Sequence, residues 1–546
     1  MIWPSLLIAQ TDEKVPHRSK AIGVELGAVA ALIALNVALY RKIVRLWWIW
    51  DDPATLRLVL DRTWWQPFVD GASWPRKMFT PLLTLFFELQ LALFDLDAGR
   101  YYVLHLVMVA ATAIAVYGAM RSFTGPGPAL SGAVVFLAGA PLCSIVTQLS
   151  TIHYFLAVFF AALAVMFWRW AGISALLYLL SLLAKEVAAP LPLVLLALPH
   201  RDLRWRVRHC IGHFVAFAVY YMWRGLVLET FGGGYGWAIG LDDWRPLLLF
   251  PWKLLRLATG SEAVLAFLLV AMIVMVLALG IRSRRGWLVV LLAMVLAAAP
   301  YAPMAKDLAA RFAVVPWLTI AAAFAAAASR VKDRRLRAAI LIAVPVLAIL
   351  ANRAEWSREL RYKRRMSDEN RFFFYDLPAN GLLRNPALTG HDIGELNWLR
   401  TDYMRREPGG ICFYDDLYLL ANDVRDKRVW EYDPGRRAVV EITEDVPAIV
   451  SRQQRITRMN APLSARFTYR DATLHWDLGP YDRGRYSALF GNGLRAGEIG
   501  RRDALRFPVA SAIALRIRYD SPDGWMTYSP ELTLDLTKST AFSWSR

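Results

Sequence analysis

Long apolar runs alternate with short polar segments along the chain from about residue 20 to residue 350. Eleven of these runs predict transmembrane helices, although several are shorter than the roughly 20 residues that usually cross a bilayer. The predicted spans are 21–46, 101–120, 128–147, 154–168, 172–184, 187–199, 210–227, 262–281, 286–304, 312–329 and 337–351. The pattern therefore predicts a polytopic α-helical membrane domain over residues 21–351.

One further apolar run, residues 79–94, lies in the first long loop, which extends from about 47 to 100. The run reads FTPLLTLFFELQLALF and contains Pro81, Glu88 and Gln90. It is about 24 Å long as a helix, which is short for a span. A crossing here would also move every later loop to the other side. We therefore expect an amphipathic helix that lies along the outer surface.

The pattern changes after the last predicted span. Residues 352–374 read as an exposed connecting helix, and short alternating segments follow, such as RVWEYD and ARFTYRDATLHWDLG. Aromatic and β-branched residues bounded by Gly, Pro, Asn and Asp indicate antiparallel strands. Residues 375–546 are thus expected to form a β-rich domain. Within it, the aromatic stretch 474–486 favours packing in a strand core over contact with a sugar.

Composition and charge agree with a membrane protein and give an orientation. The 546 residues are 57% hydrophobic with a mean hydropathy of +0.34, and 63 Lys and Arg against 45 Asp and Glu give a net charge of +18. The basic residues form short clusters between the spans, which marks cytoplasmic loops and argues against nucleic-acid binding. Residues 1–20 are then cytoplasmic, and eleven spans place the β-rich domain in the periplasm of a bacterial inner membrane. Arg41, Lys42 and Arg45 run against this rule.

Cysteine and histidine patterns indicate neither disulfides nor a metal cluster. Cys143, Cys210 and Cys412 are far apart, and no CxxC motif is present. We expect no required cofactor. If a divalent cation takes part, Asp51 and Asp52 are the residues whose oxygen atoms could bind Mg²⁺ or Mn²⁺.

Ionisable residues recur at the predicted outer ends of the spans. Such groups are costly in a membrane unless they face water or one another, so they predict a mixed-charge cavity that opens outward. The set comprises Asp51, Asp52, His105, His153, Lys185, Glu186, Lys306, Asp307 and Arg311. Each has a structural alternative: Asp52-Pro53 could start a helix, Lys185-Glu186 could pair with each other, and Arg311 could anchor a span end.

The order of four motifs resembles the GT-C superfamily of membrane glycosyltransferases, in particular its protein O-mannosyltransferase and aminoarabinose-transferase-like branch. The motifs are the acidic pair Asp51-Asp52 after the first span, WPRKMFTPLLTL at 74–85, LFDLDAGRYYVLHL at 93–106, and the later pair LLAKEVAAPLPLVLL at 182–196 and RFAVVPWL at 311–318. The resemblance covers about residues 20–350.

The resemblance implies a hexosyl- or pentosyltransferase that moves a sugar from a polyprenyl-phosphate donor to a glycan, lipid or protein acceptor on the outer face, with inversion. Asp52 would be the base or acceptor-orienting carboxylate, with Asp51 second. The donor phosphate would be bound by Lys185, Arg311, Arg76 and Lys77. Donor or acceptor orientation would fall to Glu186, His105, Tyr102 and His153.

Three other functions fit parts of the pattern. An O-antigen-ligase or polymerase-like enzyme would also use polyprenyl-linked sugars, but through Arg and His in a large late loop. A lipid or sugar transporter would tolerate intramembrane charges, although the sequence contains no visible inverted repeat. A glycan-binding envelope scaffold would need no carboxylate at the membrane surface.

Overall fold

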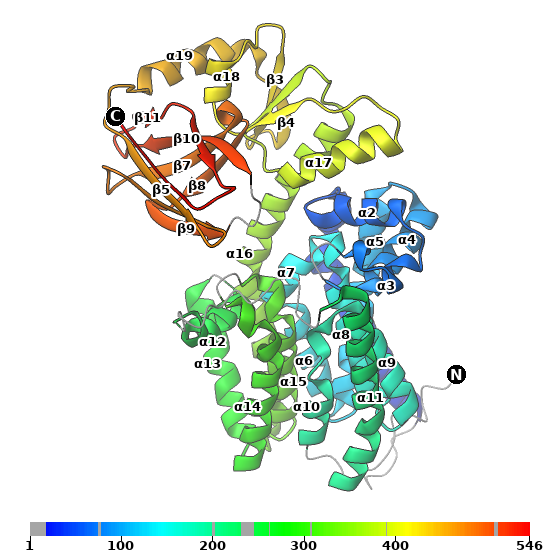
Figure 1. Cartoon of the computed structure of the whole chain (residues 1–546). Coiled ribbons are helices and arrows are strands. Elements are labelled where there is room, and N and C mark those ends of the chain that lie inside the picture. The colour runs from blue at the N-terminus through cyan, green and yellow to red at the C-terminus, as the bar shows by residue number, and fades with distance from the viewer. Residues whose placement is uncertain are drawn as a thin grey trace. The chain divides into compact units, whose positions relative to one another are not determined.

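The computed structural model describes residues 18–74, 78–198, 202–230, 245–260, 262–305, 308–388, 390–506 and 511–546. The chain divides into two compact units, Met1–Arg364 and Arg365–Arg546 (Figure 1). The first unit is helical and the second contains all the described strands. The predicted plan of a multi-helix membrane domain followed by a β-rich domain is confirmed.

The first unit is a bundle of long apolar helices. Eight described helices are long and apolar enough to cross a membrane, or nine if one bent pair counts as a single span. The chain is therefore a multi-pass membrane protein. In chain order the helices are α1 (Arg18–Tyr40), α2 (Asp51–Asp61), α3 (Gln66–Val69), α4 (Pro81–Phe94), α5 (Ala98–Arg121), α6 (Pro126–Leu137), α7 (Ala140–Val146), α8 (Ile152–Met166), α9 (Ala171–Ala184), α10 (Leu191–Ala197), α11 (Leu203–Leu228), α12 (Arg245–Thr259), α13 (Ala263–Gly280), α14 (Arg284–Ala298), α15 (Val314–Ala328) and α16 (Arg334–Tyr375).

Two of the eleven predicted spans, 172–184 and 187–199, form helices that are too short for an ordinary span. Helix α9 has 14 residues, which is about 21 Å against a hydrocarbon core of about 30 Å. The chain nevertheless reverses its direction between the two helices, each of which packs on its neighbours in the bundle. The Ser174 hydroxyl donates to the carbonyl of Ala164 on α8, and Leu195 near the end of α10 packs with Trp168 and Cys210. The alternation of chain direction is kept through this part of the bundle.

Helix α4 occupies the run that was expected to lie on the surface. It also has 14 residues, and its leucines at positions 85, 89 and 93 are exposed on one face. On the opposite face Phe87 is fully buried, with its ring centroid 6.0 Å from that of Tyr101 on α5. One face thus packs on the bundle and the other presents an apolar stripe, as an interfacial helix does. Its placement in a membrane stays a prediction.

The bent pair α6 and α7 positions a loop that the candidate site uses. The two helices meet at 59°, and the indole N–H of Trp317 on α15 donates at the break to the carbonyls of Val135 (3.0 Å) and Phe136 (3.3 Å). The Phe136 carbonyl also accepts the N–H of Gly139, whereas the Val135 carbonyl loses its i+4 partner at the bend and is satisfied by the indole. Gly139 makes room for the ring, because a Cβ there would lie 2.0 Å from the indole nitrogen.

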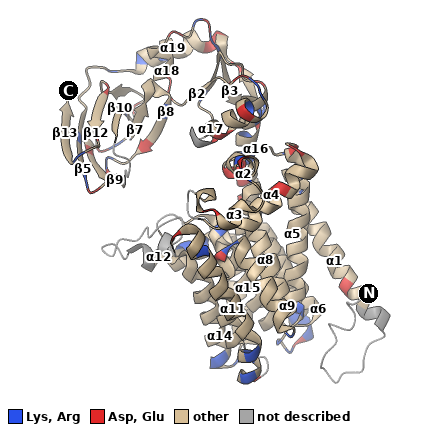
Figure 2. Cartoon of the chain, turned by 45° about the vertical axis from the view of Figure 1, so that its right-hand side comes forward, with Lys and Arg blue, Asp and Glu red and all other residues tan. Residues whose placement is uncertain are grey.

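Basic residues collect at one end of the bundle. In Figure 2 Lys and Arg colour the lower helix ends beside α14 and α9. The residues belong to the end of α5 and the starts of α11, α14 and α16, for example Arg121, Arg204, Arg284 and Arg334. Arg41, Lys42 and Arg45 do not interrupt an α-helix, because α1 ends at Tyr40 and these cations occupy a 3₁₀ turn.

The last predicted span and the connecting helix, 337–351 and 352–374, are one continuous helix of 42 residues, α16. It contains Pro345 without ending there. Near its middle, Trp356 packs edge-on against Tyr40 with a centroid separation of 4.9 Å. The first compact unit ends at Arg364, within this helix.

The second unit begins with a small mixed sheet of order β2-β1-β3-β4. Strand β1 pairs in parallel with β2 and β3, whereas β3 and β4 form an antiparallel hairpin. The expectation of antiparallel strands is therefore wrong for β1. Helix α17 lies between β1 and β2 in the chain and makes the crossover that parallel pairing needs. The elements are β1 (Gly381–Arg384), α17 (Gly390–Trp398), β2 (Ile411–Phe413), α18 (Leu417–Ala421), β3 (Arg428–Asp433), β4 (Ala438–Glu441) and α19 (Val446–Ile456).

The rest of the second unit consists of two antiparallel sheets. One has the order β11-β10-β7-β8 with β12 also paired to β10, and the other has the order β13-β5-β6-β9. Side chains alternate between a shared core and the outside, as in β5, where Phe467 is buried and Arg466 is exposed. The strands are β5 (Ser464–Arg470), β6 (Thr473–Gly479), β7 (Arg485–Phe490), β8 (Arg495–Ile499), β9 (Arg502–Arg506), β10 (Ala512–Asp520), β11 (Met526–Tyr528), β12 (Leu532–Asp535) and β13 (Thr540–Ser545).

Candidate active site

The acidic pair begins helix α2, directly after the tryptophan-rich segment that follows the first span. Trp50, at φ +51°, is the residue that precedes the helix, so Asp51 and Asp52 occupy the first helical turn. Carboxylates are favoured there by the helix dipole. Asp52 is thus not the N-cap that its position before Pro53 suggested. Its Oδ2 accepts the backbone N–H of Ile49 at 3.1 Å, which closes the turn that leads into the helix.

The second oxygen of Asp52 joins the helix to a distant segment. Its Oδ1 accepts the backbone N–H of Ser150 at 2.7 Å, in the loop between α7 and α8. The side chain is fully buried. Burial raises the pKa of Asp52 to about 7, against the opposing effect of the hydrogen bonds from Ser150 and Ile49, while nearby Asp51 adds to the increase. Asp51 itself is half-buried, so it is the more accessible carboxylate of the pair.

Tyr102 and His105 hold the same loop from helix α5. The Tyr102 hydroxyl donates to the Thr147 carbonyl at 3.1 Å, and His105 Nε2 lies 3.3 Å from the carbonyl oxygen of Ile145. Both side chains are fully buried. The Tyr102 hydroxyl also lies 3.5 Å from the Trp47 carbonyl oxygen, and the His105 ring packs against Phe155 of α8 with a centroid separation of 5.6 Å. The two side chains therefore support the loop that carries Ser150 from both of its ends. A role in orienting donor or acceptor stays a prediction for these two residues.

His153 connects this loop with two of the predicted phosphate-binding cations. Its Nδ1 lies 2.7 Å from the Ser150 carbonyl oxygen, and it interacts electrostatically with Lys185 and Arg311. The Lys185 ammonium lies 5.9 Å from the ring centroid of Tyr154, the residue beside His153. Residues from the loop after α7, the end of α9 and the start of α15 therefore share one region.

A third cation, Lys363 of α16, lies in this region and was not predicted. Its side chain is fully buried, with Nζ 3.0 Å from the ring centroid of Trp50 and 3.6 Å from Glu359. It interacts electrostatically with Asp52 and Arg311. Lys363 carries no signal in the sequence, because its segment is charged throughout and reads as a solvated helix.

Glu186 does not pair with its neighbour Lys185. Its carboxylate accepts from Arg224 of α11 at 3.0 Å, and the Arg224 side chain is only 2% exposed. This ion pair fixes the start of the α10 segment against the end of α11. Arg224 was also missed, although an arginine inside an apolar run is the kind of signal that identifies a buried partner.

The remaining predicted residues contribute less to the described geometry. Arg76 and Lys77 lie outside the described residues, as do Lys306 and Asp307. Arg311 lies 5.3 Å from the ring of Phe312, measured from its guanidinium carbon. No group of three His, Cys, Asp or Glu in the described part of the chain could hold a metal ion. Both Asp52 oxygens accept backbone N–H groups, so they do not fit a cation shared with Asp51. Metal dependence stays a prediction.

Comparisons with known proteins give weak matches. No family model matches the chain, and no curated protein matches it. Two solved structures of the oligosaccharyltransferase from Archaeoglobus fulgidus are similar in outline. The complex with zinc and sulfate has 13% identity and a TM-score of 0.42, covering 87% of this chain and 72% of that one. The form tethered to an acceptor peptide has 12% identity and a TM-score of 0.43, covering 90% and 79%. We base no argument on a likeness this low.

Proposed function

We propose that this protein is an integral membrane glycosyltransferase that moves a sugar from a polyprenyl-phosphate donor to an acceptor. One observation carries the proposal: an acidic pair and three cations from separate helices converge at one end of the bundle. Lys363 interacts with both Asp52 and Arg311, and His153 interacts with both Lys185 and Arg311. Such a set suits a reaction in which one group loses a proton while another develops negative charge.

The cations suit the leaving group. When a sugar leaves a polyprenyl phosphate, negative charge develops on the phosphate oxygens, and fixed positive charges stabilise it. Arg311 and Lys185 are our candidates to contact the phosphate. Lys363 is buried against Trp50. It adds positive charge near the phosphate without contacting it. Arg76 and Lys77 stay candidates from the outer loop.

The two carboxylates suit different roles: one acts on the acceptor hydroxyl and the other supports the structure of the site. A hydroxyl becomes a competent nucleophile when a carboxylate within hydrogen-bond reach takes its proton. Asp51 is the more exposed carboxylate of the two, and Asp52 holds the helix start and the Ser150 loop together. The earlier prediction of Asp52 as the base requires that its carboxylate become accessible. Either assignment gives attack opposite the phosphate and inversion at the anomeric carbon.

The charge distribution supports an outward-facing site. The basic helix ends would face the cytoplasm under the positive-inside rule. The acidic pair lies after the first span, whereas the basic ends belong to the opposite ends of the later helices. We therefore place the reaction on the periplasmic side of a bacterial inner membrane, with the second unit on that side as well.

The test is a transfer assay with purified full-length protein. A panel of polyprenyl-phosphate hexoses and pentoses, each radiolabelled in the sugar, is incubated with host membrane extract as acceptor, and loss of label from the lipid is followed. Asp51→Asn, Asp52→Asn and Arg311→Ala should each lower transfer by at least about a hundredfold, the scale of losing a positioned base or a charge clamp. Arg100→Ala is the matched control, because Arg100 is exposed and pairs only with Asp97 among the described residues.

Consumption of no lipid-linked sugar by the folded wild type would contradict the proposal. Unassisted movement of the intact lipid or sugar across a vesicle membrane would instead support a transporter. Transfer of a whole polyprenyl-diphosphate-linked chain would support the ligase-like alternative.

A further inference from the structure

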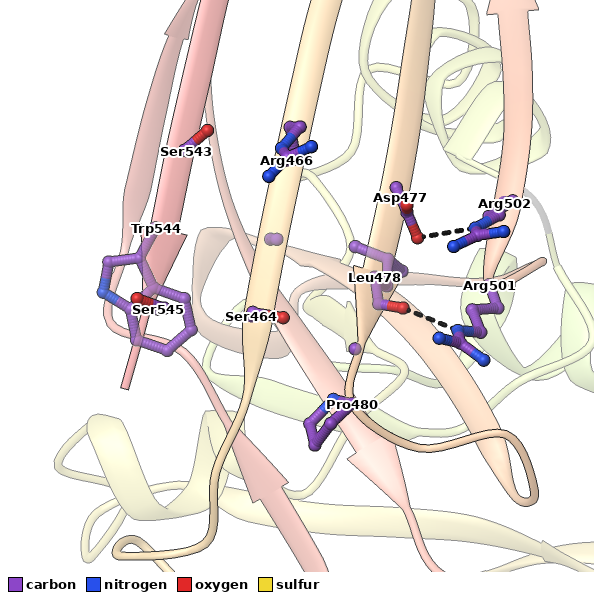
Figure 3. A pocket seen from close by; sticks show the side chains of 12 residues that line it. Ser464, Arg466, Asp477, Leu478, Pro480, Arg501, Arg502, Ser543, Trp544 and Ser545 are labelled. Carbon is purple, nitrogen blue, oxygen red and sulfur yellow. Dashed lines mark hydrogen bonds and ion pairs between the residues drawn. The ribbon is translucent and has the colours of Figure 1, made fainter.

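The second unit carries a hollow on the outer face of the sheet β13-β5-β6-β9. It has a volume of about 360 Å³ and is bounded by residues of all four strands or the turns beside them (Figure 3). The hollow lies far along the chain from the acidic pair, and the argument below does not depend on the proposed glycosyl transfer. Its size is near the lower end of the ~300–1,000 Å³ typical of small-molecule sites.

The strand register explains why a hollow forms at this place. Ser545 on β13 is opposite Ser464 on β5, which is opposite Gly479 on β6. These three small residues make a low row across three strands. The row is also tightly constrained, because a Cβ on Gly479 would lie 2.9 Å from the Ser464 hydroxyl oxygen. The serine hydroxyls make no hydrogen bond to another described residue, so they are available to a ligand.

The next row across the sheet is charged. Ser543, Arg466, Asp477 and Arg502 lie opposite one another on the four strands. Arg502 donates to Asp477 at 2.9 Å, and this hydrogen bond is the main reason that the pKa of Asp477 is lowered, with Arg501 and Arg466 contributing. Three arginines therefore surround one carboxylate at the edge of the low row.

The three arginines differ in whether their guanidinium group already pairs with a carboxylate. Arg502 is paired with Asp477, and Arg501 forms an ion pair with Asp482 and donates to the Leu478 carbonyl. Arg466 has no hydrogen bond or ion pair to any residue in the described part of the chain. With three positive and two negative side chains, the rim keeps one positive charge, and Arg466 carries it toward the hollow.

We propose that this hollow binds a sugar unit that bears an acidic group. The acidic group binds Arg466, because guanidinium groups favour carboxylate and phosphate oxygens. The sugar hydroxyls meet Ser464 and Ser545, and the ring lies over the low row beside Pro480 and Arg501 (Figure 3). A neutral sugar would leave Arg466 unused, and a bare anion would leave the serine row unused.

The test uses the full-length protein in detergent micelles and four probes: digalacturonate, glucose 6-phosphate, neutral galactobiose and inorganic phosphate. Binding is measured by microscale thermophoresis at low salt. We expect one or both acidic sugars to bind at least tenfold more tightly than galactobiose and inorganic phosphate. The better acidic probe then distinguishes a carboxylate from a phosphate as the group that is recognised.

Two variants connect the binding to this hollow. Arg466→Ala should weaken the acidic sugar to the level of the neutral one, and Ser545→Tyr should abolish binding by filling the low row. Arg470→Ala is the matched control, because Arg470 lies on the same face of β5, is 78% exposed and pairs with Asp471. Equal binding of neutral and acidic sugars, equal binding of inorganic phosphate, or equal effects of the Arg466 and Arg470 variants would overturn the proposal.

Discussion

The buried carboxylate of Asp52 should make the stability of the membrane unit depend on pH. Burial raises its pKa from 3.8 to about 7. A carboxyl group with a raised folded pKa stabilises the fold fully below its unfolded pKa, and this contribution is lost as pH rises through the folded value. The difference of about three units corresponds to about 4 kcal/mol in all, at ~1.4 kcal/mol per unit. About 3 kcal/mol of this change should fall between pH 5 and pH 8.

Asp52→Asn should remove this dependence. An asparagine side chain has one acceptor oxygen, so it can keep the hydrogen bond from either Ile49 or Ser150 but not both. The N–H group that is left unpaired costs about 1–3 kcal/mol. The variant should therefore be less stable than the wild type at pH 5. At pH 8 the wild type bears a buried charge, so the difference should vanish or reverse.

The assay is a guanidinium titration of the purified protein in detergent, followed by tryptophan fluorescence at pH values from 5 to 8. Buried Trp48 and Trp317 in the membrane unit report its unfolding. Asp51→Asn is the matched control, because it removes a half-buried carboxylate one position earlier in the same helical turn. Groups that titrate elsewhere affect all three proteins equally. If wild type and Asp52→Asn show the same change in unfolding free energy from pH 5 to pH 8, the reasoning from burial is refuted.

Three other perturbations probe contacts around the site. Arg224→Met leaves Glu186 without its partner in the ion pair and should cost about 3 kcal/mol in the same titration, whereas the double variant with Glu186→Gln should recover at least a third of that loss. Gly139→Ala forces a methyl group against Trp317 and should cost about 1–3 kcal/mol; a smaller cost in a Trp317→Phe background would identify the ring as the cause, and an equal cost would exclude it. Lys363→Met should raise the KM for the lipid donor more than it lowers kcat in the transfer assay, while an unchanged KM would remove this lysine from the donor site.

Much of the membrane unit was readable from the sequence because bilayer-spanning helices are specified by local composition. Failures occurred where a distant residue decides the local structure. The bend between α6 and α7 is supported by Trp317, which lies 182 positions from Val135. Gly139 and Pro141 mark a helix break within 128–147, but nothing there identifies this distant partner. The mixed sheet was missed for a related reason: alternation predicts strands but not the direction in which β1 pairs.

The candidate site, like the fold, could be predicted from the sequence only in part. The acidic pair and the adjacent residues Lys185 and Glu186 could be predicted as site residues, because charged residues are conspicuous beside apolar runs. Lys363 was hidden in a segment where charge is the rule, and only the fold places its ammonium on the ring of Trp50. A pair between Glu186 and its neighbour Lys185 was one alternative, yet the ion pair is made with Arg224, 38 positions further along the chain.

The geometry also changes what an adjacent pair of aspartates can mean. Two carboxylates at a helix start would repel each other if both were exposed and ionised side by side. In this fold the two carboxylates lie in different surroundings: Asp52 is fully buried and accepts two backbone N–H groups, whereas Asp51 in the same turn is half-buried. Asp52 accepts the N–H of Ser150, whose carbonyl contacts His153, and it interacts electrostatically with Lys363, which also interacts with Arg311. We therefore expect the ionisation of Asp52 to affect the charged groups of this region. A wild-type activity profile that changes near pH 7, with no such change in the residual activity of Asp52→Asn, would follow from this arrangement. A profile with the same step in Asp52→Asn would place the titrating group elsewhere.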